Sequence, residues 1–415
     1  MSVRKRTWTT PKGEHKTAWV VDYFDGQGVR RLKTFKLKKE ADAFSATASV
    51  EVRQGTHVAD SASVTVNAAG KLWLATATAS GLERSTTAQY RQHLELHMAP
   101  LIGDTLLSKL NVPAVRQFED DLRESGRSPA MVRKVITSLG SLLSDAQERG
   151  LVGRNVVREK SRTRAKGKDK RLERRQKGKL KIGVDIPSRD EIRAIIAKLE
   201  DRWRPVLLTA IFCGLRASEI RGLRWMDVDV DRREIHVRQR ADRFNDIGRP
   251  KSEAGERTVP VPPMVANALR ELRLSYSRPI IGRDTAGSLL REEARPEHLV
   301  FPNGSGKVES LANIINRGLC PVQVTAGVTM DSGKVDKDGV AILQAKYRGM
   351  HSLRHFYASW CINRPEDGGL GLPPKVVQER MGHSSILMTM DVYGHLFPKA
   401  DHADEMAEAE RSLVG

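Results

Sequence analysis

Four short stretches in the second half of the chain hold the residue types that chemistry on a phosphodiester needs. In FCGLRASEIRGLRWMDVD, Arg216 and Glu219 stand three residues apart, which places both on one face of a helix. The planar guanidinium could bind a phosphate while the carboxylate orients it. An isolated pair of this kind is more often a surface ion pair, so it does not decide the matter alone.

The second and third stretches add a lysine and two imidazoles. RPKSEAGERTVP predicts a hairpin with Lys251 just before a glycine-containing turn, where the lysine could equally be a solubilising charge. GMHSLRHFYASW, if helical, places His351, Arg354 and His355 on one face. Such a cluster is unfavourable unless an anion lies in it, although an N-cap histidine followed by a surface arginine is an ordinary alternative.

The fourth stretch, GHSSILMTMDVYGH, places Tyr393 ten residues after His383. Gly382 and His383 end a helix that we expect to begin at Pro373-Pro374. A lone tyrosine on a late helix is usually a core aromatic. Tyr357, six residues after His351, is interpreted as a packing residue of that kind.

The composition favours a polyanionic partner. The 415 residues include 70 Lys+Arg against 51 Asp+Glu, a formal net charge of +19. Neutralising phosphates releases condensed counterions, which makes nucleic acid the favoured partner. A basic membrane-surface protein is the rival, but there is no basic amphipathic helix, and neither Ser2 nor the C-terminal RSLVG suits lipidation.

Other classes of protein lack support in the sequence. Cys213, Cys320 and Cys361 are widely spaced and odd in number, which indicates neither a disulfide framework nor a structural zinc site. No GxGxxG, GxxxxGK[ST] or HExxH motif suggests nucleotide-driven or zinc chemistry. The start MSVRKRTWTT has no signal-like apolar stretch, and no apolar run approaches a membrane span, so we expect a soluble intracellular protein.

The elements that would position the four stretches are preceded by two other parts. TAWVVDYF and VRRLKTFKL alternate as strands and are followed by the helical KKEADAFSATASVEVRQG; this basic sheet could grip DNA or be a solvated face. From Val64 to about Val152 the pattern is wholly helical, a module of four helices. Its expected start and stop signals are Ser85 as the cap of the helix containing Tyr90, Pro113 and Gly126 around the next helix, and Ser128-Pro129 and Gly150 around the last.

Residues 158–181 hold thirteen Lys or Arg among twenty-four residues and predict a basic linker that could lie along a phosphate backbone. The following part opens with a capping box, Ser188 and Glu191, before a helix. A second helix is expected around PVLLTAIFCG, and alternation in REIHVRQR and ERTVPV predicts a small antiparallel sheet. From Met264 onward the pattern is mostly helical.

Taken together, the four stretches resemble the tyrosine recombinase family, the phage-type integrases. Its boxes occur in order: G-L-R-x-S-E, H-x-L-R-H, G-H-S-S, and a tyrosine followed by Gly-His. The resemblance covers residues 187–402, and it implies a mainly helical catalytic domain with a small antiparallel sheet. The helical module looks like the family's core-binding domain and the N-terminal sheet, less specifically, like its arm-type DNA-binding domain.

The resemblance therefore implies a multidomain chain. Its expected parts are a small α+β arm-type DNA-binding domain at residues 1–60, an all-α four-helix core-binding domain at 62–155, a basic linker at 156–182 and the catalytic domain at 183–415. Segments 278–297 and 331–345 look like insertions without a readable role.

The resemblance also implies roles for individual residues. Tyr393 would be the nucleophile, Arg216 and Arg354 would bind the phosphate, and His351 would take the phenol proton. Lys251 would protonate the leaving 5′ oxygen, His383 would donate to the phosphate, and Glu219 would hold the first arginine. Two arginines can stabilise a phosphoryl transition state without magnesium, so no metal and no cofactor is expected.

The implied function is site-specific recombination that cleaves and rejoins double-stranded DNA through a 3′-phosphotyrosine and integrates and excises a phage or mobile element. The expected assembly is a homotetramer on core and arm-type sites, with an excisionase and a host DNA-bending protein, at the nucleoid in the bacterial cytoplasm. A type IB topoisomerase and a catalytically silent DNA-binding regulator are the alternatives. The separate N-terminal sheet disfavours the first, and the six matching catalytic positions disfavour the second.

Overall fold

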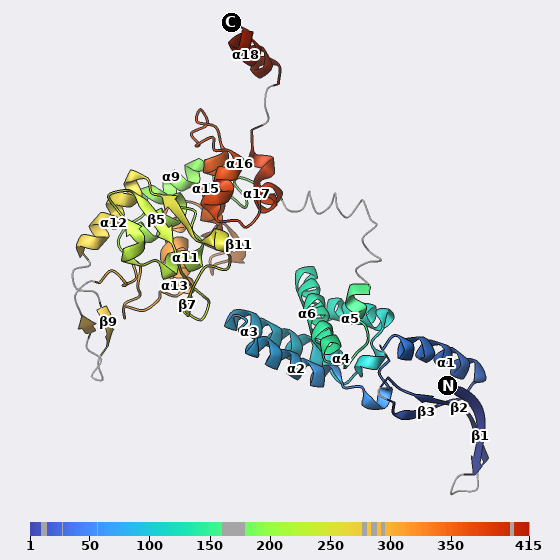
Figure 1. Cartoon of the computed structure of the whole chain (residues 1–415). Coiled ribbons are helices and arrows are strands. Elements are labelled where there is room, and N and C mark those ends of the chain that lie inside the picture. The colour runs from blue at the N-terminus through green and yellow to red at the C-terminus, as the bar shows by residue number, and fades with distance from the viewer. Residues whose placement is uncertain are drawn as a thin grey trace. The chain divides into compact units, whose positions relative to one another are not determined.

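The computed structural model describes residues 1–9, 15–26, 28–55, 57–159, 179–275, 280–283, 289–291, 295–398 and 402–414. The chain divides into two compact units, Met1–Lys168 and Asp169–Gly415 (Figure 1). Most of the predicted linker, 156–182, lies outside the described residues, as does part of the predicted insertion 278–297. Within the described part of the chain, no helix combines the length and the apolar composition needed to cross a bilayer.

The first unit begins with an antiparallel sheet and one helix. Strands β1 (Ser2–Thr9), β2 (His15–Phe24) and β3 (Arg30–Phe35) pair in the order β1-β2-β3, and helix α1 (Lys38–Arg53) follows. Val21 and Tyr23 of β2 are buried against Ala41 of α1. The strands β2 and β3 and the helix match the prediction. Strand β1 is additional, because Val3 is the one aliphatic residue in its sequence SVRKRTWT.

From Asp60 to Glu148 the first unit is mainly helical, as predicted. Its elements are η1 (Asp60–Ala62), α2 (Val66–Ala79), α3 (Arg84–His93), the π-helical turn η2 (Leu94–Met98), α4 (Ala99–Ile102), η3 (Leu107–Lys109), α5 (Val112–Glu124) and α6 (Pro129–Glu148). The apolar residues of α6 lie in the core, with Val135, Leu139 and Leu142 fully buried.

The predicted helix starts in this unit are right in two cases and wrong in one. The Ser128 hydroxyl accepts a hydrogen bond from the amide of Met131 and caps α6, and α5 carries Pro113 in its first turn. Ser85 is not a cap. The N-cap of helix α3 is Glu83, two positions earlier, and the Ser85 hydroxyl donates to the Glu83 carboxylate at 3.2 Å.

The second unit is mainly helical around a small antiparallel sheet. Its helices are α9 (Arg189–Ala197), α10 (Trp203–Phe212), α11 (Ala217–Gly222), α12 (Pro263–Ser275), α13 (Leu311–Asn313), α14 (Cys320–Thr325), α15 (His351–Ile362), α16 (Pro374–Met381), α17 (Ile386–Tyr393) and α18 (His402–Val414). Shorter turns are η4 (Trp225–Asp227), η5 (Glu253–Gly255), η6 (Ile314–Leu319) and η7 (Gly394–Leu396). The predicted capping box is present, because Ser188 and Glu191 exchange their hydrogen bonds at the start of α9.

The sheet of this unit has the order β4-β5-β8, formed by β4 (Val228–Asp229), β5 (Glu234–Val237) and β8 (Arg257–Pro260). Strands β6 (Arg240–Ala241) and β7 (Ile247–Gly248) pair separately. The predicted hairpin around Lys251 is therefore wrong: Lys251 lies in the connection from β7 to β8, and these strands pair with β6 and β5 respectively. The chain has already turned back at Asn245, whose φ is 70°.

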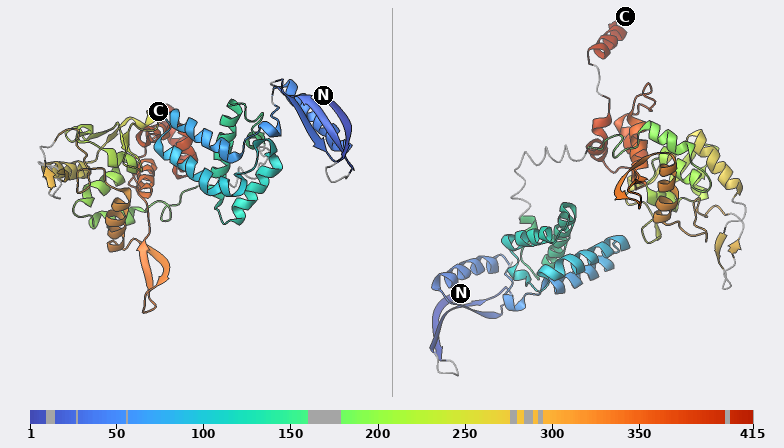
Figure 2. Two further views of the ribbon diagram at one scale, coloured as in Figure 1. Left: turned by 90° about the horizontal axis from the view of Figure 1, so that it is seen from below. Right: turned by 180° about the vertical axis from the view of Figure 1, so that it is seen from behind.

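Two further strand pairs interrupt the region expected to be mostly helical. They are β9 (Ile280–Arg283) with β10 (Leu289–Arg291), and β11 (Thr329–Val335) with β12 (Ala341–Ala345). The second pair coincides with the predicted insertion at 331–345. Figure 2 shows this hairpin, in orange in its left view, extending away from the helices of its own unit.

Candidate active site

Arg216 and Glu219 form the pair that their spacing predicts. Arg216 is the N-cap of α11, and Glu219 accepts from its amide at 2.8 Å and from its Nη1 at 2.7 Å. Nη2 of Arg216 donates to the carbonyl of Gly382, at the end of α16, at 2.9 Å. The Arg216 side chain remains 36% exposed, so the guanidinium is held in place yet open to solvent.

Arg354 is buried, and its guanidinium is close enough to the partly exposed Arg216 for the two charges to repel each other. It is 2% exposed on α15, and its two terminal nitrogens donate to the carbonyls of Gly214 and Met381. Burial, followed by repulsion from Arg216, lowers the pKa of the Arg354 guanidinium to about 9. Arg216 and Arg354 thus bind consecutive carbonyls, Gly382 and Met381, at one turn.

A third arginine was not identified from the sequence. Arg257 on β8 donates to the two oxygens of Glu219 at 3.2 and 2.9 Å, and its Nε donates to the carbonyl of Arg380 at 2.8 Å. The available signal was strand alternation, because Arg257 shares a face with the buried Val259. A charged residue on the inward face of a strand requires a buried partner.

Glu219 balances part of this positive charge. Burial raises its pKa, but Arg257, Arg354 and Arg216 outweigh burial, and the net pKa is below the usual value. Glu219 is therefore ionised at neutral pH. One carboxylate against three guanidinium groups leaves an excess of positive charge that suits an anion.

Two glycines allow the close packing of the arginines. Gly214 has φ +60°, and a Cβ there would lie 2.1 Å from the Tyr357 ring. Gly382 has φ +63°, and a Cβ there would lie 2.8 Å from Nη1 of Arg257. Since each carbonyl also accepts from a site arginine, neither position accommodates a side chain without displacing the cluster.

Tyr393 closes the site from α17. It is 2% exposed, and its hydroxyl forms a 2.7 Å hydrogen bond with Nδ1 of His355. The ring of His383 lies parallel to that of Tyr393 with centroids 6.3 Å apart, and its Nδ1 is 2.9 Å from the Thr389 hydroxyl. Burial raises the pKa of the Tyr393 phenol to about 12, against the opposing effect of Arg354 and Arg216.

The histidines are neutral in this surrounding. Burial and the charges of Arg354, Arg216 and Arg257 lower the pKa of His383 to about 4. His351 is more open to solvent, but packing around its ring, with Arg354 and Arg216, also lowers its pKa. Its ring contacts that of His355 edge to face, with centroids 4.5 Å apart.

The Tyr393 segment is also attached to the start of the second unit. His395 Nε2 is 2.7 Å from the carbonyl of Leu180, and Leu180 packs beside the buried cluster that contains Tyr393. The same cluster includes Tyr357, which was interpreted as a packing residue, and its ring lies against Gly214.

Comparison with known proteins places this arrangement in a family. The model of the Phage integrase family matches residues 188–400, which contain the three arginines, Glu219, the histidines and Tyr393 described above. The chain belongs to the phage integrase family. This membership confirms the family expected from the four sequence boxes, a family of tyrosine recombinases that act on DNA site-specifically.

Individual members of the phage integrase family show the same similarity. The chain is 24% identical over 390 residues to a tyrosine recombinase XerC-like protein of Caldanaerobacter subterraneus subsp. tengcongensis, which covers 90% of each sequence. Its fold matches the Tn1549 transposon integrase in complex with a circular intermediate DNA, with a TM-score of 0.58, 17% identity, and coverage of 84% of this chain and 99% of the other. A lambda integrase tetramer bound to a Holliday junction matches with a TM-score of 0.50 and 13% identity over 91% and 95% of the chains.

The structure brings six of the seven predicted site residues of this phage integrase together: Arg216, Glu219, His351, Arg354, His383 and Tyr393. Lys251 is exposed on the connection that follows β7. Its loop borders the site through Ala254, whose carbonyl lies 2.9 Å from the position of a Cβ on Gly382. Lys251 thus lies three residues from a contact with the cluster.

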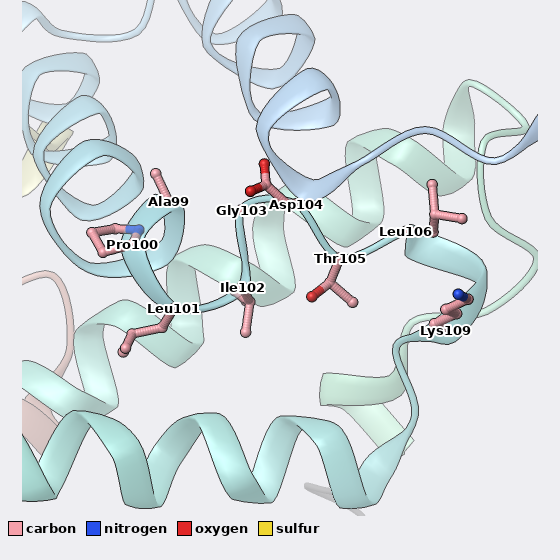
Figure 3. A pocket seen from close by; sticks show the side chains of 9 residues that line it. All are labelled: Ala99, Pro100, Leu101, Ile102, Gly103, Asp104, Thr105, Leu106 and Lys109. Carbon is pink, nitrogen blue, oxygen red and sulfur yellow. The ribbon is translucent and has the colours of Figure 1, made fainter.

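One cavity of the integrase lies in the first unit and lacks the arginines and imidazoles of the candidate active site. This cavity, of about 380 Å³, is lined by residues between Ala99 and Lys109 (Figure 3). Asp104 and Lys109 supply its charged side chains, and it has no imidazole or guanidinium. Among the described residues, no group of three or more His, Cys, Asp or Glu is arranged to hold a metal ion.

Proposed function

We propose that this integrase cleaves and rejoins double-stranded DNA through a 3′-phosphotyrosine at Tyr393, and so integrates and excises a phage or mobile element. One observation carries the proposal: Arg216 and Arg354 bind the adjacent carbonyls of Gly382 and Met381, next to the buried phenol. Two guanidinium groups and a nucleophile therefore converge on one point in the second unit.

The arginines supply the electrostatic part of the reaction. A phosphodiester gains negative charge on its non-bridging oxygens when an oxygen attacks phosphorus. Arg216, which is open to solvent, would bind those oxygens directly, while Arg354 and Arg257 add charge from behind it. The protein itself holds these three guanidinium groups in position, through Glu219 and the backbone carbonyls of Gly214, Arg380, Met381 and Gly382.

The remaining groups donate and accept protons and hydrogen bonds during the reaction. The 5′ oxygen of deoxyribose is a poor leaving group, so the proposed mechanism uses Lys251 as the general acid. His383 would donate a hydrogen bond to the phosphate, and the family resemblance assigns the phenol proton to His351. The phosphotyrosine retains the phosphodiester energy, and rejoining therefore needs no ATP.

The N-terminal sheet is proposed as an arm-type DNA-binding element. The strand register places Arg4 and Arg6 of β1 on the same face as Arg30 of β3, opposite the face that carries the buried Val21. Asp22 pairs with Arg4 at 3.5 Å and with Arg30 at 2.5 Å, which organises part of this basic face. A basic sheet face suits the phosphates and grooves of a duplex.

Domain boundaries and partners complete the proposal. We infer an arm-type domain at residues 1–60, a core-binding domain at 62–155, a linker at 156–182 and a catalytic domain at 183–415. The related lambda integrase assembles as a tetramer on a Holliday junction, which supports a homotetramer here. An excisionase, a host DNA-bending protein and a nucleoid location in the bacterial cytoplasm belong to the same proposal.

The decisive test replaces the nucleophile. Tyr393→Phe removes the attacking oxygen and keeps the buried ring, so we expect normal DNA binding and complete loss of the covalent adduct on a nicked suicide substrate. The adduct is detected as a slow-migrating protein band. Tyr357→Phe is the matched control and should retain the adduct, because Tyr357 packs on Gly214. An adduct that persists in Tyr393→Phe would remove Tyr393 from this role.

A further inference from the structure

The Tyr393 hydroxyl has a specific partner within the second unit. Nδ1 of His355 is 2.7 Å from it, within the range of a strong hydrogen bond. His355 lies one residue after Arg354 on α15, so the partner of the Tyr393 hydroxyl and one of the site arginines share a helical turn. The ring centroids of His355 and Tyr393 are 5.7 Å apart at an interplanar angle of 61°.

The groups around His355 determine which atom holds the proton. Burial, His351 and Arg354 lower the pKa of His355 to about 4, and the more distant Asp185 raises it slightly. The Tyr393 phenol, with its pKa raised to about 12, is protonated at neutral pH. A protonated phenol facing a neutral imidazole donates, so Nδ1 of His355 is the acceptor and its remaining proton is on Nε2.

We propose that His355 is the general base that takes the phenol proton of Tyr393 when this residue attacks DNA, an inference that rests on the proposed function. In the cleavage step the O–H bond of Tyr393 breaks and its proton moves to Nδ1 of His355, which becomes an imidazolium. The phenolate oxygen forms a bond to phosphorus, and the bond from phosphorus to the 5′ oxygen breaks. That oxygen takes a proton from Lys251, so the charges balance, and rejoining reverses each transfer.

His355 fits this role better than His351. A general base must reach the proton it removes, and the described hydrogen bond to the Tyr393 hydroxyl comes from His355. His351 contacts the His355 ring instead, with centroids 4.5 Å apart. When DNA binds, the negative phosphate would offset the repulsion between the arginines and an imidazolium. The proton would then be accepted more readily than in the free protein.

The first test follows the rate of adduct formation with pH on the nicked suicide substrate. His355→Asn keeps a polar atom near the position of Nδ1 but cannot accept a proton. We expect it to lower the rate at pH 7 by roughly 100-fold or more, the usual contribution of a general base. The deficit should shrink as pH rises, because a growing fraction of Tyr393 ionises without help. A rate for His355→Asn close to that of the unaltered protein at pH 7 would refute the inference.

Three comparisons separate a base from a structural support. His351→Asn should lose less activity than His355→Asn, and its rate should not rise steeply with pH. The reverse order would assign the general base to His351.

A DNA substrate with a 5′-bridging sulfur needs no general acid, so it should restore a Lys251→Ala variant but not His355→Asn. Added imidazole should partly restore His355→Ala, and a lack of rescue in a folded, DNA-binding His355→Ala protein would count against the proton transfer.

The test of the proposed function is independent of the test of His355 as the general base. Tyr393→Phe tests the nucleophile, and its result does not depend on which residue acts as the base. If Tyr393→Phe abolishes the adduct while His355→Asn leaves the rate unchanged, the recombinase proposal stands and the assignment of His355 fails. Melting temperature and DNA affinity are measured for every variant, so that loss of folding is not mistaken for loss of chemistry.

Discussion

At the scale of single residues, Glu219 is the group on which the arginine cluster depends. It accepts hydrogen bonds from Arg216 and Arg257 and lies within the electrostatic reach of Arg354, although it is itself only 2% exposed. Removing one member of a buried ionic network leaves the others without compensation. The carboxylate is therefore expected to matter for stability as well as for phosphate binding.

Glu219→Gln should lower the free energy of unfolding by about 3–5 kcal/mol, the usual cost of breaking a buried charge pair. It should also reduce adduct formation, because Arg216 loses the partner that orients it. Denaturant unfolding measures the first effect and the suicide substrate the second. Glu271→Gln, an exposed position on α12, is the control and should change neither. An unfolding free energy for Glu219→Gln equal to that of the control would contradict this account.

Individual site residues also show which contacts can be predicted from their spacing in the sequence. Arg216 and Glu219 were predictable as a pair because three residues bring them onto one turn. Arg257 was not, because it meets Glu219 from a strand 38 residues away. His355 was placed correctly on a face with His351 and Arg354, but its contact with Tyr393 depends on how α17 packs on α15. No spacing within one helix contains that information.

At the scale of elements, the end of α16 is where several parts of the second unit meet. Its last carbonyls accept from Arg257, Arg354 and Arg216, and the following Gly382 turns the chain in the left-handed region toward α17. This one turn therefore sets both the arginine positions and the entry of the Tyr393 helix.

Gly382→Ala should disturb the whole site. The left-handed backbone costs an alanine about 1–2 kcal/mol, and its Cβ would lie 2.9 Å from the Ala254 carbonyl and 2.8 Å from Arg257. We expect a lower melting temperature and a loss of adduct formation larger than the loss of DNA binding. Gly304→Ala, where nothing lies within 4 Å of the added carbon, should behave like the unaltered protein. If both alanine variants melt alike, the packing at Gly382 is less restrictive than described.

The sequence predicted where helices start and end better than it predicted which strands pair with each other. The caps at Ser128 and Ser188 and the glycine end of α16 were correct because a cap is a local hydrogen-bonding pattern. Ser85 was misplaced by two positions, since Glu83 can also occupy the N-cap. The hairpin around Lys251 failed for a different reason. Strand partners are chosen by the sheet, and β8 pairs with β5, which lies about twenty residues earlier.

At the scale of the whole molecule, the N-terminal sheet is joined to the following segment by polar contacts. Lys33 Nζ is 2.7 Å from Asp60, and Tyr23 is 2.9 Å from Nε2 of His57. Both partners of each contact lie within residues 1–60, the proposed arm-type domain. A deletion of this segment therefore removes both partners of these two contacts together, and it takes from Ser61 the hydrogen bond that Arg31 donates.

Deleting residues 1–60 should spare binding to core half-sites and impair integration between complete attachment sites. The reason is that the basic face of the sheet is lost, while the helical module and the arginine site are retained. Gel-shift assays with core DNA and an integration assay with arm-type sites measure the two properties. Full integration by the shortened protein would refute the arm-type assignment.

The turn that holds the arginines has a consequence for how the enzyme responds to acid. Backbone carbonyls have no proton to gain or lose in the range in which proteins work, so the grip of Met381 and Gly382 on Arg354 and Arg216 is insensitive to acidity. Glu219, with its lowered pKa, stays ionised until the medium is strongly acidic. The imidazole of His355, with its pKa lowered to about 4, also stays neutral through a mild drop in pH, so the proton acceptor and the arginine cluster persist together until the medium is strongly acidic.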